Sequence, residues 1–190
     1  MARKPLALQK SIALIGMMGA GKSTLGKRLA RRLGLPFADA DEEIEAAAGL
    51  SIAEIFERYG EAHFRDGERR VLARLIEGPP RVIAAGGGAF IDAETRALML
   101  DRCIAIWLDV EVEVLAERVG RRDHRPLLKG QDPLARLRDL AASRNPVYAE
   151  AHIRIGSGTH SHDKTVEQII AALKDRPRAE PGAPPGDCPG

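Results

Sequence analysis

The segment Gly16–Thr24 reads GMMGAGKST and decides the fold. It fits the pattern G-x-x-x-x-G-K-[ST]. The apolar run Ser11–Ile15 precedes it, and Leu25, Leu29 and Leu33 recur every four residues after it. This context predicts a strand, a glycine loop and a helix with one buried face. Glycines in such a loop let backbone N–H groups turn around phosphate oxygens, and the helix adds its positive N-terminal end.

The loop therefore predicts a site for a nucleoside triphosphate. Lys22 is expected to reach the β- and γ-phosphates, and the Ser23 hydroxyl is expected to ligate Mg²⁺. The glycine order is not G-x-G-x-x-G, so a dinucleotide fingerprint is rejected. The loop residues predicted to hold the nucleotide are Gly19, Ala20, Gly21, Lys22, Ser23 and Thr24.

Further strand and helix patterns alternate along the chain. The predicted strands are Ser11–Ile15, Pro36–Ala38, Val82–Ala85, Cys103–Leu108 and Ile153–Ile155. Four further helices are predicted over Glu42–Ala48, Ala62–Ile76, the residues from Asp92 to Leu100, and Glu111–Val119. A capping box of Ser51 and Glu54 opens another helix between the first two of these, and one more starts at Pro133. Val166, Ile169, Ile170 and Leu173 line the last helix. Alternation with short loops predicts an α/β fold with a parallel sheet covered on both faces.

Length and composition set the outer limits. The chain has 190 residues, which suits one domain, and its net charge of +2 is not gathered into a basic run. We therefore expect no nucleic-acid and no membrane partner. There is no secretory signal pattern, and Cys103 and Cys188 form no disulfide framework, which favours a cytoplasmic protein. The Pro- and Gly-rich stretch 174–190 predicts a disordered tail after a single domain over residues 1–173.

Two carboxylates follow the second predicted strand, as Asp39-Ala40-Asp41. Alternation along an extended segment would place both on one side, at the carboxyl end of the sheet where ligands bind. One could hold Mg²⁺ through water and the other could accept a proton from an acceptor hydroxyl. The alternative is an ordinary acidic helix start.

Together with these features, the chain from about Ser11 to Leu173 resembles the shikimate kinase family. The motifs that carry the resemblance are GMMGAGKST, Asp39-x-Asp41 with Ile44-Glu45, Ser51–Phe56, Gly60-Glu61, Phe64-Arg65, Gly86–Ala89, Arg125–Leu128 and Arg144-x-Pro146-x-Tyr148. The resemblance implies transfer of the γ-phosphate of MgATP to the 3-hydroxyl of shikimate, a step toward chorismate and the aromatic amino acids. It also implies a three-layer P-loop NTPase fold with strand order 2-3-1-4-5, and a monomer.

The family assigns an acceptor site to particular residues. Arg65 and Arg144 match its two carboxylate-binding arginines, a role that suits a planar guanidinium. Asp41 matches the residue that orients or deprotonates the attacking hydroxyl. The run Gly86, Gly87 and Gly88 matches the glycines that let the backbone approach the substrate ring.

The family also assigns residues on the nucleotide side. Asp39 matches a carboxylate near Mg²⁺, and Arg118 matches a residue that flanks adenine. Arg125 lies in the basic stretch of about 120–131, which the family uses as a lid, and is expected to reach the phosphates when the lid closes. The catalytic set implied is thus Lys22, Asp41 and Arg125.

Several alternatives and departures stay open at this stage. Gluconate kinase shares the fold, a nucleotide kinase would need a base-binding segment, and a non-catalytic ATP-binding module would lack catalytic groups. A GTPase is disfavoured because no Asn-Lys-x-Asp motif is present. Asp66 could divert Arg65 into a local ion pair, although adjacent helical residues do not face each other. The loop 156–162 matches the family poorly, so we predict no adenine contact there, and the five histidines are interpreted as surface residues.

Overall fold

A single parallel sheet forms the centre of the molecule. The structure, a computed structural model, describes residues 9–120, 132–158 and 160–176. The sheet order is β2-β3-β1-β4-β5, and every adjacent pair is parallel. This confirms the predicted strand order. The strands are β1 (Ser11–Ile15), β2 (Phe37–Asp39), β3 (Val82–Ala84), β4 (Cys103–Val110) and β5 (Ile153–Ser157).

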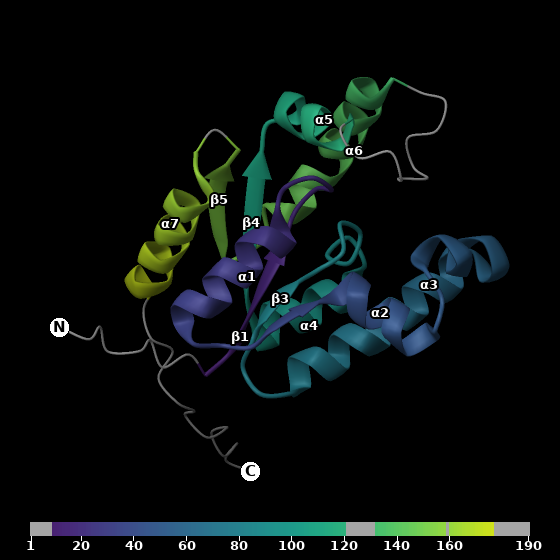
Figure 1. Cartoon of the computed structure of the whole chain (residues 1–190), viewed down its shortest axis with the longest axis horizontal. Helices are drawn as coiled ribbons and strands as arrows, with labels where there is room; N and C mark the ends of the chain where they lie inside the picture. The colour runs from purple at the N-terminus through teal and green to yellow at the C-terminus, as the bar shows by residue number, and fades with distance from the viewer. Residues whose placement is uncertain (1–8, 121–131, 159, 177–190) are drawn as a thin grey trace, which may run out of the picture.

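Helices cover both faces of this sheet. Figure 1 shows α1 in front of the strands and α4 behind them, with α7 beside α1. The helices of the described residues are α1 (Lys22–Leu33), α2 (Ala40–Ala48), α3 (Ile52–Glu77), α4 (Ala93–Arg102), α5 (Val112–Gly120), α6 (Pro133–Tyr148) and α7 (His162–Asp175). In the described part of the chain, no helix combines the length and the apolar character that crossing a bilayer requires.

The core lies between the sheet and its helices. All five residues of β1 are buried, because β3 and β4 flank this strand and helices cover it. A strand buried on both faces reads as a continuous apolar run rather than an alternating one. This burial holds the end of β1, and so the glycine loop after it, in a fixed place.

Local signals in the sequence account for most helix ends. The Ser51–Glu54 capping box is present, and Asp92 and Asp132 cap α4 and α6 through their side chains. The two helices predicted on either side of Gly60 form the two halves of α3, and a kink separates them where Gly60 has the non-helical angles φ 79° and ψ 176°. Only glycine adopts this conformation without cost, and it bends α3 between its two halves.

Candidate active site

The glycine loop between β1 and α1 has the backbone of a phosphate cradle. Gly16, Gly19 and Gly21 have φ of 135°, 81° and 89°, a region that favours glycine. Gly21 caps α1 without a side-chain bond, so the first N–H groups of the helix stay available to a ligand. The Lys22 ammonium donates to the Gly16 and Met17 carbonyls, at 2.9 and 3.0 Å. These bonds hold its charge over the loop.

Ser23 and Asp39 come together beside Lys22. The Ser23 hydroxyl donates to Oδ2 of Asp39 at 2.5 Å, and the Asp41 N–H donates to Oδ1 at 3.1 Å. Asp39 therefore caps α2, and Asp41 is the second residue of that helix rather than part of an extended segment. The expectation from strand alternation was wrong, because the Asp39 side chain ends the strand by capping α2. Both carboxylates nonetheless line one cleft.

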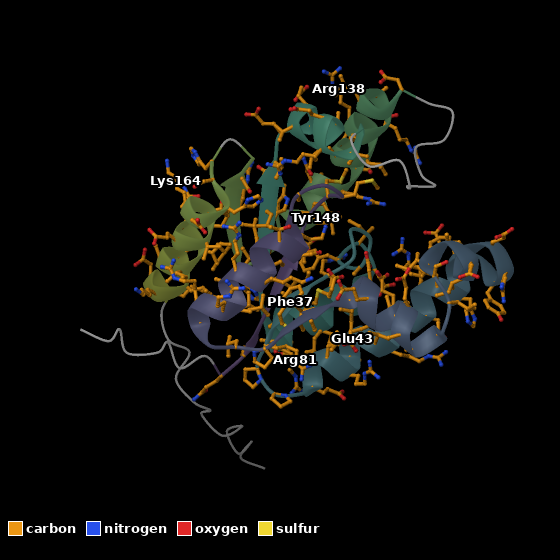
Figure 2. All side chains as sticks on the ribbon, viewed as in Figure 1. Phe37, Glu43, Arg81, Arg138, Tyr148 and Lys164 are labelled. Atoms are coloured by element: carbon orange, nitrogen blue, oxygen red, sulfur yellow. The ribbon has the colours of Figure 1, made fainter. Side chains whose placement is uncertain are left out.

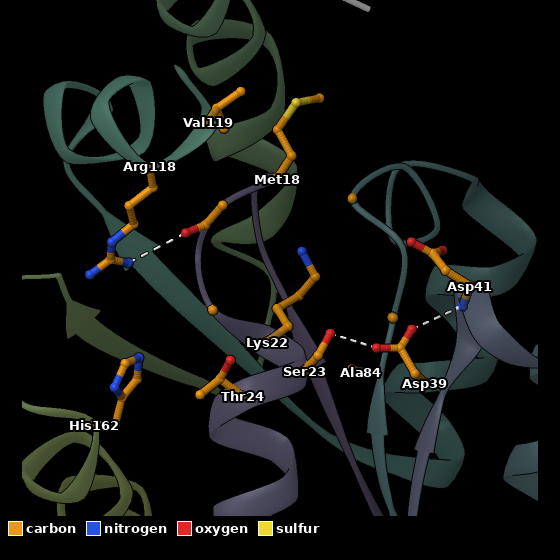
Figure 3. Close-up of a pocket in the computed structure, with 14 residues that line it drawn as sticks. Met18, Lys22, Ser23, Thr24, Asp39, Asp41, Ala84, Arg118, Val119 and His162 are labelled. Carbon is orange, nitrogen blue, oxygen red and sulfur yellow. Dashed lines mark hydrogen bonds between the residues drawn. The ribbon is translucent and has the colours of Figure 1, made fainter. Parts of the chain in front are cut away.

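The cleft has a volume of about 430 Å³ and two distinct ends. Figure 3 shows Asp39 and Asp41 at one end, Arg118 and His162 at the other, and Lys22 between them. Such a layout can hold an elongated ligand whose phosphates lie over Lys22. The cleft is lined by Met18, Gly19, Gly21, Lys22, Ser23, Thr24, Asp39, Asp41, Ala84, Ala85, Gly87, Arg118, Val119 and His162.

Arg118 is tied to the loop from the far end of the cleft. Its guanidinium donates to the Gly19 carbonyl at 3.3 Å and to the Gly158 carbonyl at 3.2 Å. It therefore joins α5 to the glycine loop and to the loop after β5, and its planar group stays at the edge of the cleft.

His162 is a cleft residue that the sequence interpretation missed. It is the first residue of α7, capped by Ser161, and its Nε2 lies 4.0 Å from the Cβ position of Gly21. His162 is exposed, as the interpretation of the histidines as surface residues expected, but that interpretation did not anticipate its place in the cleft wall. The usable signal was its position after a strand of the parallel sheet, since loops at the carboxyl edge line the ligand crevice.

The glycine run after β3 lies against the two predicted substrate arginines. A Cβ on Gly88 would lie 2.5 Å from both terminal nitrogens of Arg65, and a Cβ on Gly87 would lie 3.7 Å from Nη1 of Arg144. A Cβ on Gly86 would lie 2.6 Å from Oε1 of Glu68 and 3.1 Å from Oδ1 of Asp41. Arg65 on α3 and Arg144 on α6 thus meet at one backbone segment, and Gly87 of that segment also lines the cleft with Lys22.

Glu68 is a second residue that the sequence interpretation missed. It is 2% exposed, and its Oε2 accepts from Nη1 of Arg65 at 2.7 Å. Burial raises the pKa of the Glu68 carboxyl, the Arg65 bond opposes this, and the charges of Asp41 and Asp92 raise it further. Although burial lowers the pKa of Arg65, the bond to Glu68 raises it above its ordinary value. The i,i+3 spacing on a helix was the available signal.

Asp66 does not divert Arg65. It pairs with Arg70 one turn along α3 and with Arg69 at 3.8 Å. Arg65 instead contacts Glu61 at 3.2 Å, through a carboxylate that is mostly exposed. A substrate carboxylate can replace that exposed partner while Glu68 keeps the guanidinium in place.

Two further predicted site residues are Ala20, which the structure describes, and Arg125, which lies outside the described residues. Ala20 is buried within the loop and is not part of the cleft wall. Arg125 and the lid of about 120–131 lie outside the described residues, except for Gly120 at the end of α5. No group of three or more His, Cys, Asp or Glu side chains within the described ranges could hold a metal ion alone.

Comparison with known proteins gives one consistent result. A family model described as shikimate kinase matches residues 18–174. A shikimate kinase of Caulobacter vibrioides is 56% identical over 165 residues, which cover 87% of this chain and 82% of that protein. The solved shikimate kinase of Acinetobacter baumannii, in complex with shikimate, has a TM-score of 0.84 and 39% identity, with 87% of this chain and 93% of that chain covered.

A gluconokinase structure from Sinorhizobium meliloti is more distant. Its TM-score is 0.56 at 19% identity, with 87% of this chain and 92% of that chain covered. At that identity the likeness concerns the fold alone.

The sheet order and the glycine loop define a P-loop fold, and the family match makes the protein a P-loop kinase, an enzyme that uses ATP as a substrate. Within that class, the family match over most of the chain and the high identities settle the relationship. The chain belongs to the shikimate kinase family.

Proposed function

We propose that this chain transfers the γ-phosphoryl group of ATP to the 3-hydroxyl of shikimate, releasing ADP and shikimate 3-phosphate. The observation that carries the proposal is that Arg65 and Arg144 lie against the same backbone segment, at Gly88 and Gly87 respectively. Gly87 and Lys22 line the same cleft. Two guanidinium groups suit a single carboxylate, and shikimate offers one. The relative that is solved with shikimate supports this choice of acceptor.

We propose that the acceptor hydroxyl binds at the Asp41 end of the cleft. In the transfer, the 3-hydroxyl oxygen forms a bond to the γ-phosphorus while the bond from that phosphorus to the β,γ-bridging oxygen breaks. The hydroxyl proton passes to the Asp41 carboxylate or to solvent that Asp41 orients. Lys22 and the N–H groups at the start of α1 stabilise the negative charge on the phosphates.

Mg²⁺ fits the pair formed by Ser23 and Asp39. A hydroxyl and a nearly buried carboxylate, 2.5 Å apart, supply the hard oxygen donors that this ion prefers. Two protein donors suffice, because Mg²⁺ keeps several waters and takes further ligands from phosphates. When bound, the ion would neutralise charge on the transferring group.

We propose that the nucleoside binds at the other end, between Arg118 and His162. Thr24 lies between Lys22 and His162 in the cleft wall (Figure 3), and the Cβ position of Gly21, which also lines the cleft, is 4.0 Å from Nε2 of His162. Arg125 is proposed to reach the phosphates from the lid when the lid closes, which would also exclude water and so limit hydrolysis of ATP. The family resemblance further leads us to propose a monomeric, cytoplasmic enzyme, which sedimentation and cell fractionation test.

A coupled ADP-release assay tests the acceptor. ADP release with MgATP is expected to rise strongly when shikimate is added and to stay low with gluconate or with a nucleoside monophosphate. Equal rates with and without shikimate would reject this acceptor, and a rise with gluconate would favour that alternative.

Asp41→Asn tests the role of the Asp41 carboxylate. It should reduce turnover far more than ATP affinity, since Asp41 acts on the acceptor and not on the nucleotide. Near-normal turnover in this variant would remove Asp41 from the mechanism.

A further inference from the structure

Tyr148 is a buried phenol at the acceptor site with no part in the mechanism above. It is the last residue of α6 and is fully buried, and its hydroxyl donates to the Gly87 carbonyl. Figure 2 shows it at the inner end of α6, beside the strands. Burial raises the pKa of this phenol, so it keeps the proton that the bond requires.

The same carbonyl has a second donor from the same helix. Nη1 of Arg144 donates to the Gly87 oxygen at 3.4 Å, one turn before Tyr148 on α6. A carbonyl oxygen has two lone pairs, so both donors can be accommodated. The charges of Arg144 and Arg65 both lower the pKa of Tyr148 against the effect of burial. The phenol therefore lies close to both substrate arginines.

Holding this carbonyl sets the orientation of a whole peptide unit. The peptide bond is planar and trans, so the N–H of Gly88 points opposite to the oxygen of Gly87. The neighbouring peptides are held by turn bonds, from Ala89 N–H to Gly86 at 3.1 Å and from Ile91 N–H to Gly88 at 3.0 Å. The Gly87 carbonyl is instead held by side chains of α6. Three consecutive glycines offer little other resistance to rotation of this peptide.

Packing fixes the phenol itself. The Trp107 ring of β4 lies with its centroid 6.0 Å from the Tyr148 ring, and Trp107 in turn lies beside Gly16 at the start of the phosphate loop. The position of the hydroxyl is therefore set by the sheet and not by a mobile surface segment.

We propose that Tyr148 is a positioning residue of the acceptor site. Its hydroxyl holds the Gly87–Gly88 peptide so that this backbone and Arg144 stay in the geometry that receives the acceptor's carboxylate and ring. The inference rests on the proposed function, since it concerns binding of shikimate.

Tyr148→Phe removes the hydroxyl and keeps the ring against Trp107. We expect KM and Kd for shikimate to rise about fivefold, which corresponds to about 1 kcal/mol of binding free energy. We expect KM for ATP and kcat to stay within about twofold. Shikimate binding is measured by calorimetry in the presence of ADP, so that it does not depend on turnover.

Ser11→Ala is the matched control. Its hydroxyl is buried at the opposite end of β1 and accepts from the Arg81 N–H at 3.2 Å. This variant should lose thermal stability by an amount similar to Tyr148→Phe and leave shikimate binding unchanged. A purely structural role for Tyr148 would make the two variants alike.

The outcomes separate this inference from the proposed function. If the unmodified protein gives no shikimate-dependent ADP release, the acceptor assignment fails. If it does, and Tyr148→Phe binds shikimate normally, only the positioning role is overturned. Tyr148→Met is a second variant without the hydroxyl. Failure of both variants to fold would assign the hydroxyl to stability and also overturn the inference.

Discussion

Gly88→Ala puts a methyl group where the Arg65 guanidinium now lies. The new Cβ would be 2.5 Å from both terminal nitrogens and 2.7 Å from the central carbon, whereas ordinary contact begins at 3.4 Å. Gly88 does not have a positive φ, so alanine fits the backbone and the effect comes from the side chain alone. Arg65 must therefore retreat by about 1 Å or more, which its flexible stem allows.

Among the kinetic constants, the effect should fall on KM for the acceptor. Hydrogen bonds to a charged group contribute about 1.5–3 kcal/mol. Losing this much from the pairing with the shikimate carboxylate raises KM for shikimate by about 10- to 150-fold. The phosphate loop is not touched, so KM for ATP should stay within about twofold. The melting temperature should fall as well, because the displaced guanidinium is the hydrogen-bond partner of the buried Glu68 carboxylate.

Initial rates over a shikimate series at saturating MgATP measure this effect. Gly67→Ala is the control, because it adds the same methyl group to α3 two residues from Arg65. No heavy atom would lie within 4 Å of the new Cβ of residue 67. It should stabilise α3 by up to about 1 kcal/mol and leave both KM values unchanged.

A double-mutant cycle tests the route of the effect. If Gly88→Ala acts through Arg65, it should add little in an Arg65→Ala background. The reasoning is refuted if Gly88→Ala leaves KM for shikimate within about twofold, or if ATP affinity falls as much as shikimate affinity.

Three other outcomes can be measured directly. His162→Ala should raise KM for ATP about two- to tenfold, because a ring contact to the nucleotide is lost, and it should leave KM for shikimate unchanged. Unchanged ATP kinetics would remove His162 from the nucleotide site. Asp39→Asn keeps a good helix cap, so this variant should fold normally. Because it removes the carboxylate charge, it should raise the Mg²⁺ concentration for half-maximal activity about tenfold. An unaltered Mg²⁺ titration would contradict the metal assignment. His152 accepts from the Ala105 N–H at 3.0 Å, and burial, followed by the charges of Arg176 and Lys10, lowers its pKa. The folded state therefore binds this proton less readily than the unfolded state, so the stability that His152 contributes is complete above about pH 6.5 and declines as the pH falls below it. His152→Ala should flatten this part of a denaturation–pH profile and cost about 1–3 kcal/mol at neutral pH, and an unchanged slope would show that another group titrates.

The sequence alone determined the phosphate loop, the alternation of strands and helices, and most helix caps. These features depend on residues close together in the chain, such as the glycines of Gly16–Thr24 and the Ser51–Glu54 capping box, so local chemistry reveals them. Strand order came only from resemblance to a family, because pairing between distant strands leaves no local mark. The motif match also named Arg65 and Arg144, although nothing in their own neighbourhoods distinguishes them from surface arginines.

Tertiary structure decided how those residues combine. Glu68 as the buried partner of Arg65, His162 at the far end of the cleft and Tyr148 on the Gly87 carbonyl all depend on contacts within or between folded elements. Asp39 and Asp41 show the same limit of sequence reasoning. Alternation along an extended segment predicted that both lie on one side, but Asp41 lies in a helix. Their shared cleft results from a helix cap at the end of β2, where the backbone changes direction. A local sequence pattern specifies the helix or strand to which a residue belongs, but the packing of these elements specifies which groups its side chain contacts.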